Sequence, residues 1–322
     1  LAEHKVAAIF GCWTSSSRKE VLPVVEELNG LLFYPSQYEG EEESPNIFYT
    51  GATPHQQALP AVDYLLRQGR KRFFLAGTDT VYPRTTNAII KAYLRARQIG
   101  GDDVAEFYTP FDHKNWEDAV DWMQRFGARG DAAIVSTVSG DANIYFYREL
   151  ARQGITAEHM PAMTLSIGEG ELPAIAGPEM AGHLATWSYL HAIDSPENQA
   201  FVAAWREFCG AANVVTDDPM EATWIGFNLW KEAVGLEGTV EVDAGRRALG
   251  GLRLKAPSGF EVVMDLTNHH LHKPAVIGRI TEDGRIVPIW MSRGLIAPEP
   301  WSPWLSDTDR EAALNGAPRA VP

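Results

Sequence analysis

The sequence contains little cysteine and no long hydrophobic segment. Cys12 and Cys209 are its only cysteines among 322 residues, and they form neither a CxxC pair nor the Cys/His spacing of a zinc site. A disulfide framework and a structural zinc site are therefore not indicated. No run reaches the roughly 18 apolar residues of a membrane span, and the first residues lack the basic-then-apolar pattern of a signal peptide. We expect no direct insertion into a membrane.

Basic residues are scarce relative to acidic ones. The chain has 28 Lys and Arg against 42 Asp and Glu, which gives a formal net charge of −14. Nucleic acids and anionic membrane surfaces attract clustered Lys and Arg, so this balance argues against either as a partner. We expect the partner to be a small or neutral molecule.

The common catalytic and nucleotide-binding motifs GxxxxGK[ST], GxSxG and HExxH do not occur in the sequence. Gly168–Pro173 begins like GxGxxG, but it ends in proline and carries carboxylates where a pyrophosphate would lie. His269, His270 and His272 invite a metal site, yet adjacent histidines point apart on a strand and no carboxylate or cysteine is spaced to help. Cys12 as a nucleophile needs a histidine that the sequence does not identify. We therefore expect a binding protein without cofactor or metal, not an enzyme.

What the sequence does have is a regular alternation of strand and helix patterns. A first block is predicted with strands 5–10, 31–34 and 72–76 and helices 17–28, 55–67 and 85–97. A second block is predicted with strands 105–109, 132–136, 162–166 and 183–188 and helices 115–126 and 141–153. After these come helices 196–208 and 219–234, a strand 260–264 and a hairpin of 275–281 with 285–291. Such alternation predicts an α/β fold with two doubly wound lobes and a cleft between them.

Ligands of such sheets bind outside the carboxyl ends of the strands. Gly11–Ser17 follows the first strand and places Trp13 beside four consecutive hydroxyl residues at the start of a helix. Free backbone N–H groups and hydroxyls there can hold a carbonyl or carboxylate oxygen. The alternative is that the serines only cap the helix, with Ser17 and Glu20 as a capping box, but this leaves Trp13 unexplained.

Two further strand ends in the first block combine aromatic and polar groups. Tyr34–Glu39 follows the second strand, and its alternative interpretation is an ordinary turn. Gly77–Arg84 follows the third strand, where Asp79 and Arg84 could instead form a structural pair. The run Glu39–Glu43 is typical of a solvated face, with Glu39 as its only candidate for the cleft.

The second block repeats the arrangement. Ser136–Asp141 and Ser166–Glu171 end strands, and their carboxylates could accept hydrogen bonds from ligand amides. Asp141 could equally be a helix cap, and Trp187, which ends another strand, could belong to the core.

Several motifs together resemble a known family: GCWTSSSRKEVLPVVEELNG, LLFYPSQYEGEEESPNIFYTGATPHQQALPAVDYL, GTDTVYPRTTN, VSTVSGDAN, SIGEGEL, IDSPENQAFVAAW, TDDPMEATWIGF, NHHLHKP and PWSPW. In combination, from about Val6 to Leu305, they resemble the urea-binding periplasmic component of an ABC transporter. That family belongs to the branched-chain amino-acid type and is similar to short-chain amide sensors.

The resemblance implies a type I periplasmic-binding fold with two Rossmann-like lobes, three crossovers and hinge closure. It implies lobe 1 over 1–103 and 192–265 and lobe 2 over 104–191 and 266–305. The tail over 306–322 is rich in Ala, Pro and charge, and we expect it to be frayed. The resemblance also implies a periplasmic location, an ABC permease as partner, and a further βαβ-type unit and signal peptide before the position of Leu1.

The resemblance also carries over site residues. The amide sensors hold their ligand with the segments that here are Trp13-Thr14-Ser15 and Tyr34-Pro35-Ser36. They use an aromatic where this chain has Thr80, a departure for which Tyr82 could compensate. Urea-type members would read closer to GEEEL where Gly170 interrupts the acidic run here. The candidate ligand-binding residues are Trp13, Thr14, Ser15, Tyr34, Ser36, Gln37, Thr80, Tyr82, Gly140, Asp141, Glu169 and Trp187.

Urea is planar and neutral, with four N–H donors and one carbonyl acceptor, so its site needs a donor, several acceptors and flat walls. We expect Ser15 with nearby backbone N–H groups to supply the donor, and Glu169, Asp141 or backbone carbonyls to accept. Three aromatic side chains are expected to form the walls, namely Trp13, Tyr34 and Trp187. The alternatives are a branched-chain amino-acid binder, a cytosolic amide sensor that regulates transcription, and an amidohydrolase.

Overall fold

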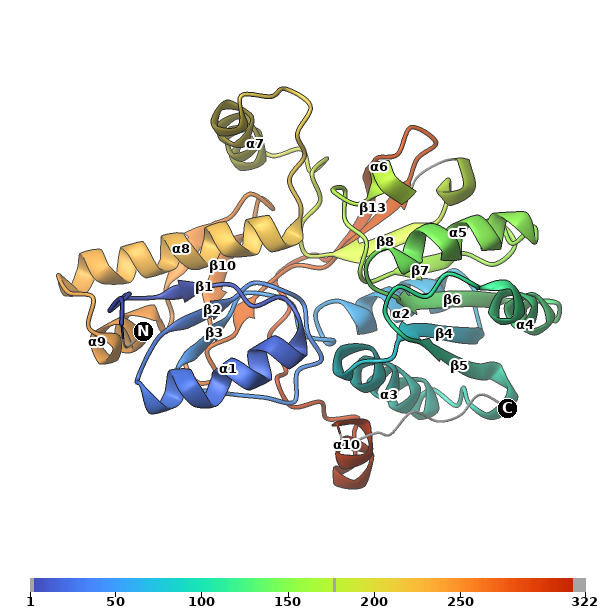
Figure 1. The fold of residues 1–322 in the computed structure, drawn as a ribbon, viewed down its shortest axis with the longest axis horizontal. Helices are drawn as coiled ribbons and strands as arrows, with labels where there is room; N and C mark the ends of the chain where they lie inside the picture. The colour runs from blue at the N-terminus through green and yellow to red at the C-terminus, as the bar shows by residue number, and fades with distance from the viewer. Residues whose placement is uncertain (1–2, 176–177, 315–322) are drawn as a thin grey trace.

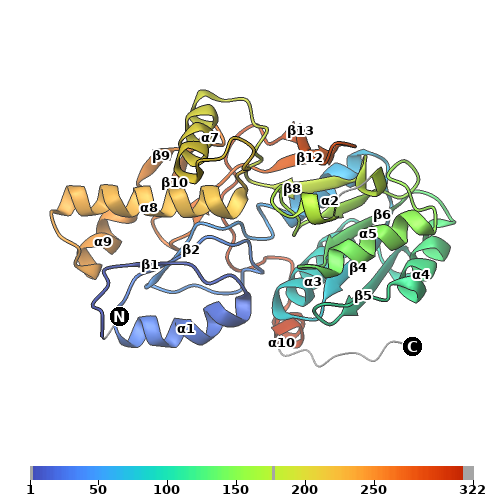
Figure 2. The same cartoon turned by 45° about the horizontal axis from the view of Figure 1, so that its top comes forward.

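The chain folds into two lobes that lie side by side (Figures 1 and 2). The structure is a computed structural model and describes residues 3–175 and 178–314. A seven-stranded sheet forms the large lobe, and two three-stranded sheets form the small lobe. This arrangement confirms the expected α/β class with two lobes.

The large lobe is built on strands β4 Arg72–Thr78, β5 Val104–Thr109, β6 Ala132–Thr137, β7 Ala162–Thr164, β8 Leu184–Trp187, β12 Val276–Ile280 and β13 Ile286–Met291. Their order in the sheet is β13-β12-β8-β7-β6-β4-β5. Strands β4 to β8 pair in parallel, whereas β12 pairs antiparallel with both β8 and β13. The predicted C-terminal hairpin therefore extends one edge of the parallel sheet.

Helices cover both faces of this sheet: α2 Ala58–Arg67 and α3 Val81–Ala96 on one, α4 Glu117–Gly127 and α5 Ala142–Arg152 on the other. The alternation along β4 explains this. Phe73 and Leu75 pack in the cluster of α2 and α3, and Phe74 and Ala76 pack in the cluster of α4 and α5. All four are fully buried, so the centre of the strand is apolar toward both faces, as is typical of a parallel sheet covered on both sides.

The small lobe contains the parallel strands β1 Ile9–Phe10, β2 Leu32–Tyr34 and β3 Ile47–Tyr49. Helix α1 Ser15–Glu27 covers one face, and α8 Asp218–Glu237 covers the other, followed by α9 Val242–Leu249. The antiparallel strands β9 Arg253–Lys255, β10 Glu261–Met264 and β11 Leu271–His272 complete the lobe. A parallel bridge from Tyr49 to His270 joins the two small sheets.

The chain crosses between the lobes three times, after β3, after β8 and after β11. Helix α7 Pro196–Cys209 lies within the second crossing, and the short helices η1 Gly101–Asp103, α6 Leu172–Ile175 and η2 Pro178–Met180 belong to the large lobe. After β13 the chain contacts both lobes, because Leu295 packs on the small-lobe core and Leu305 lies in the large-lobe core. The described part of the chain ends in α10 Asp307–Leu314, which lies beside α3 (Figure 1).

The strand pairing places the first lobe boundary earlier than expected. Residues 1–103 were assigned to lobe 1, but β4 pairs with β5 and β6, so the chain enters the large lobe directly after β3. Within 266–305, β11 remains in the small lobe and only β12 and β13 join the large sheet. Strands β3 and β9 and helix α9 were not predicted. The tail forms α10 over its first residues, and 315–322 lie outside the described residues.

A buried lysine connects the three crossing segments. The Lys273 ammonium, fully buried after β11, donates to the carbonyl of Thr50 at 2.9 Å and lies 3.6 Å from the carboxylate of Asp218. Asp218 in turn accepts from the backbone N–H of Ser188 at 2.9 Å. Thr50, Ser188 and Lys273 belong to the three different crossing segments. The Lys273–Asp218 ion pair therefore joins these segments at Asp218, the first residue of α8.

Replacing Lys273 tests this connection. Lys273→Met leaves the Asp218 carboxylate buried without its cation, and we expect it to lower the free energy of unfolding by about 3 kcal/mol. Thermal or denaturant unfolding followed by circular dichroism measures the loss. Lys231→Met, which removes an exposed lysine of α8, is the matched control and should change stability by less than about 0.5 kcal/mol. Equal stability of the two variants would contradict the assignment.

Candidate functional site

A cavity of about 240 Å³ lies between the lobes, at the carboxyl ends of the strands. The start of α1 and the loop after β2 form its small-lobe wall: Trp13, Thr14, Ser15, Ser16, Ser36 and Gln37. Large-lobe loops, the start of α3 and the end of β8 form the opposite wall: Thr80, Val81, Tyr82, Phe111, Ser139, Ser166, Gly168, Glu171 and Trp187. The segment that begins α8 adds Asp217 and Pro219.

The structure brings most of the predicted site residues to this cavity. Those that line it are Trp13, Thr14, Ser15, Ser36, Gln37, Thr80, Tyr82 and Trp187. Those that do not are Tyr34, Gly140, Asp141 and Glu169. Tyr34 is fully buried and donates its hydroxyl to the carbonyl of Trp13 at 2.9 Å, so it supports the wall from behind. Asp141 is exposed at the start of α5.

Several lining residues were missed by sequence reasoning, and the strand-end rule reaches most of them. Phe111 comes shortly after β5, and Ser139 and Ser166 lie in the predicted segments after β6 and β7. Asp217 follows no strand, so the strand-end rule does not reach it. In the structure Asp217 is the N-cap of α8, with its carboxylate accepting from the N–H of Met220 at 3.0 Å.

Helix α1 begins earlier than the predicted capping box. Thr14 is its N-cap and accepts from the backbone N–H of Ser17 at 3.1 Å, so Ser17 lies inside the first turn. The expected Ser17–Glu20 box is therefore wrong. The earlier start places Ser15 and Ser16 in the first turn and at the cavity wall, where their N–H groups have no acceptor within the helix.

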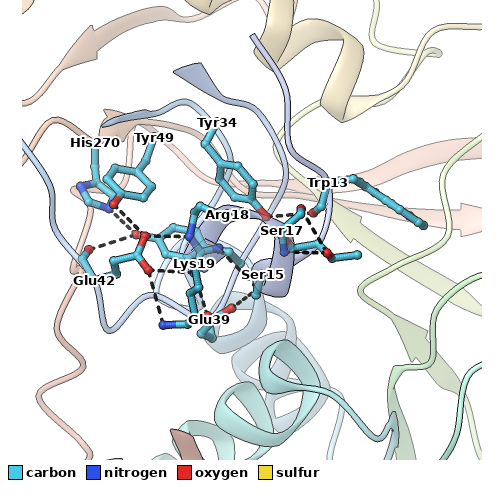
Figure 3. A network of polar contacts seen from close by, with 12 residues as sticks. Trp13, Ser15, Ser17, Arg18, Lys19, Tyr34, Glu39, Glu42, Tyr49 and His270 are labelled. Carbon is cyan, nitrogen blue, oxygen red and sulfur yellow. Dashed lines mark hydrogen bonds and ion pairs between the residues drawn. The ribbon is translucent and has the colours of Figure 1, made fainter. Parts of the chain in front are cut away.

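The hydroxyl of Ser15 is already engaged. It donates to the carboxylate of Glu39, which also accepts from the guanidinium of Arg18 at 2.9 Å (Figure 3). Ser15 was expected to donate to a ligand carbonyl, and the structure corrects this because its only hydroxyl hydrogen points to Glu39.

Most of the acidic loop behind Ser15 is buried, contrary to the expected solvated face: Glu39, Glu41 and Glu42 are buried, and Glu43 is exposed. Arg18 has no exposed surface, and it contacts Glu42 at 2.7 Å as well as Glu39. The rings of Tyr34 and Tyr38 lie 4.9 and 4.5 Å from its guanidinium carbon. Burial acts to raise the pKa of Glu42, but Arg18 outweighs it and holds that pKa below its usual value. Glu42 is therefore ionised.

Two further carboxylates, those of Glu171 and Asp217, lie on the opposite side of the cavity from the acidic loop. Glu171 accepts from the N–H of Gly168 at 2.6 Å, and Asp217 packs against the same loop, with its Cβ beside Gly168 and its carboxylate beside Gly170. Burial raises the pKa of both Glu171 and Asp217, and the charge of Asp217 adds to the rise at Glu171. Both carboxylates line the cavity and present hydrogen-bond acceptors to it.

Three lining side chains are fixed by backbone carbonyls of the large lobe. Trp187 donates its indole N–H to Ile167 at 2.8 Å and combines both expected roles, since it lies in the core and lines the cavity. Gln37 donates its amide to Leu165 at 3.3 Å, across the lobe boundary. Tyr82 lies within 3.5 Å of the same carbonyl.

Other motifs have structural partners. Arg84 pairs with Asp79 and lies over the ring of Tyr108 at 4.4 Å, which matches the structural alternative for that pair. His269 stacks on Phe48 at 4.4 Å between ring centroids. The neighbouring His270 stacks on Tyr49 at 4.2 Å, and His272 lies 3.0 Å from Asp265.

A family model described as "Periplasmic binding protein domain" matches residues 1–307. The chain belongs to this family. Its fold is similar to a solved ABC-transporter solute-binding protein from Rhodopseudomonas palustris in complex with p-hydroxybenzoic acid, at 22% identity and TM-score 0.80, covering 93% of this chain and 81% of that chain. A branched-chain amino acid ABC transporter periplasmic ligand-binding protein from Burkholderia xenovorans is 16% identical with TM-score 0.77, covering 92% of this chain and 79% of that chain.

One curated relative has a different name. "Limonene hydroxylase" from Geobacillus stearothermophilus is 28% identical over 133 residues, which is 41% of this periplasmic binding protein domain. The match covers 23% of that relative, so this chain spans less than a quarter of its length. Among the described residues, no helix has both the length and the apolar character to cross a membrane.

Glu169 provides a pH test of this region. It lies beside the cavity wall but faces the backbone N–H of His191 at 2.8 Å, and burial raises its pKa to about 8. A carboxyl whose pKa rises on folding is ionised at a stability cost, so its contribution falls as the pH rises from about 4.5 to about 8. Glu169→Gln should therefore melt higher relative to wild type at pH 8 than at pH 5.

Thermal melts of both proteins at the two pH values measure this difference. Glu158→Gln, at an exposed glutamate of the same lobe, is the control and should track the wild type at both pH values. A melting difference between Glu169→Gln and wild type that does not change with pH would contradict the buried assignment.

Proposed function

We propose that this chain is the solute-binding component of an ABC importer and that it captures urea or a short-chain amide in the cavity between its lobes. The observation that carries the proposal is the composition of the cavity wall. Among the described lining residues there are hydroxyls, carboxylates, an amide and flat aromatic rings, but no Lys, Arg or His. Such a wall suits a small neutral molecule with several N–H donors.

The charge of the wall argues against an anionic solute. A carboxylate ligand would lie near Glu171 and Asp217 without a cationic side chain to compensate. Arg18 is close behind Ser15, but it is fully buried and already pairs with Glu39 and Glu42. The aromatic acid found in the Rhodopseudomonas palustris neighbour is therefore a poor model for the solute of this chain.

Aromatic side chains supply the flat walls that a planar amide needs. Trp13 is 61% exposed and Phe111 is 46% exposed, although both line the cavity. They come from opposite lobes, so closure of the lobes around a solute would cover apolar surface on both. The cavity volume of about 240 Å³ lies below the roughly 300–1,000 Å³ of drug-sized ligand sites.

A transport role implies that the chain acts in the periplasm and delivers its solute to membrane permease subunits. An importer component and a cytosolic sensor would bind the amide at the same site. They differ in the partner that recognises the closed form, which is a membrane permease for the importer and a regulator of transcription for the sensor. Hydrolysis of the amide has less support, because burial raises the pKa of the Cys12 thiol and disfavours the nucleophilic thiolate.

Isothermal titration tests the proposal directly. The protein should bind urea or acetamide and should not bind 4-hydroxybenzoate at the same concentration. Leucine is the discriminating probe, since its ammonium suits Glu171 and Asp217 whereas its carboxylate has no cationic partner in the wall. Binding of leucine or 4-hydroxybenzoate in preference to both amides would overturn the proposed solute class.

Two variants locate the binding site. Trp13→Ala removes an exposed flat wall and Ser15→Ala removes a polar contact, and each should weaken urea binding at least about tenfold, or 1.4 kcal/mol. Phe208→Ala is the control, because Phe208 is 82% exposed on α7 and does not line the cavity. Unchanged titration curves for Trp13→Ala and Ser15→Ala would place the solute elsewhere.

A further inference from the structure

Ser15 connects the cavity to the buried ion pair behind it. Its side chain lines the cavity, and its hydroxyl donates to Glu39 (Figure 3). Glu39 and Arg18 have no exposed side-chain surface, and their N–O distance is 2.9 Å. Ser15 therefore links the cavity to an ion pair that has no contact with solvent.

The charge pair fixes the direction of the hydrogen bond. A carboxylate that is paired with a buried guanidinium is ionised and can only accept hydrogen bonds. Ser15 must therefore donate to Glu39, and a serine hydroxyl has one hydrogen to donate. The Nη1 atom of Arg18 also donates to the Ser15 oxygen at 3.4 Å, which occupies one of its two lone pairs.

What Ser15 offers the cavity is then a lone pair and not a hydrogen. The neighbouring side chain of Gln37 also presents a hydrogen-bond acceptor. The Nε2 atom of Gln37 donates to the carbonyl of Leu165, and its Oε1 atom has no hydrogen-bond partner among the described residues. Glu171 and Asp217 add carboxylate oxygens to the wall.

We propose that Glu39 and Arg18 are positioning residues for solute recognition, which lock the Ser15 hydroxyl as a hydrogen-bond acceptor so that the solute must place an N–H group against it. The inference rests on the proposed function and specifies its recognition step: Ser15 contacts the amide nitrogen and not the carbonyl oxygen. Neither Glu39 nor Arg18 touches the solute.

If Glu39 had a purely structural role, its replacement would weaken urea binding equally with and without Ser15. A double-mutant cycle distinguishes this from a role that acts through Ser15. The variants are Ser15→Ala, Glu39→Gln and the double variant, each titrated with urea. If Glu39 acts through Ser15, Glu39→Gln weakens urea binding about tenfold when Ser15 is present and less than about twofold in the Ser15→Ala background. Fully additive losses would overturn the proposal.

The matched control is Glu41→Gln. Glu41 belongs to the same buried loop and also pairs with an arginine, Arg310, but it contacts neither Ser15 nor the cavity. It should bind urea like the wild type. Should Glu39→Gln fail to fold, Glu39→Asp replaces it in the cycle, since it keeps the charge opposite Arg18 and withdraws the carboxylate from Ser15 by one methylene. Coupling with Ser15 is expected for this variant too, and its absence contradicts the proposal.

Neutron diffraction of the deuterium-exchanged, solute-free protein provides a test that does not depend on the solute. The Ser15 hydroxyl deuterium should lie between its oxygen and Glu39. A deuterium directed into the cavity would overturn the inference, even if urea binds. A wild-type protein that binds no amide would refute the proposed function, while the neutron map would still decide the orientation of Ser15.

Discussion

The ligand side of the small lobe depends on the buried charge of Arg18. A guanidinium without exposed surface must be neutralised within the protein, because burying it unpaired would cost far more than folding can return. Glu39 and Glu42 supply that neutralisation, and two tyrosine rings flank the cation. The loop after β2 is thereby held against α1, and the first turn of α1 is held at the cavity wall.

The same contacts connect distant parts of the chain. Glu42 accepts from the hydroxyl of Tyr49 at 2.9 Å, Tyr49 stacks on His270, and Glu41 accepts from the backbone of Ser302 at 2.8 Å. The loop therefore reaches β3, the segment before β11 and the C-terminal segment. The Lys273–Asp218 pair adds a second buried contact at the three crossings.

Much of this architecture could be predicted from the sequence because local patterns determine it. Apolar strands that alternate with amphipathic helices gave the two-lobe α/β fold, and the strand-end rule found residues as far apart as Trp13 and Trp187 in one cavity. Strand β3 is as short as β2, but it follows the acidic run Glu39–Glu43, which was interpreted as a solvated face, and it was missed. The lobe boundary was misplaced because strand pairing is a tertiary property that no local pattern encodes.

The roles of side chains were harder to predict than their positions. Glu39–Glu43 has the composition of a solvated loop, and the burial of Glu39, Glu41 and Glu42 depends on two arginines distant in the sequence, Arg18 and Arg310. Ser15 was expected to donate to the solute because nothing in the sequence shows that its hydrogen belongs to Glu39. Whether a hydroxyl donates or accepts a hydrogen bond depends on its neighbours in space. The sequence shows which polar groups are present but not which of them are neighbours.

The central claim is that a neutral amide binds between the lobes with its nitrogen against Ser15. A crystal structure of the protein grown with saturating urea tests it most directly. We predict urea between the aromatic walls, with an N–H group directed at the Ser15 oxygen. Urea bound with its carbonyl oxygen on Ser15, or a cavity left empty of urea, would contradict the account.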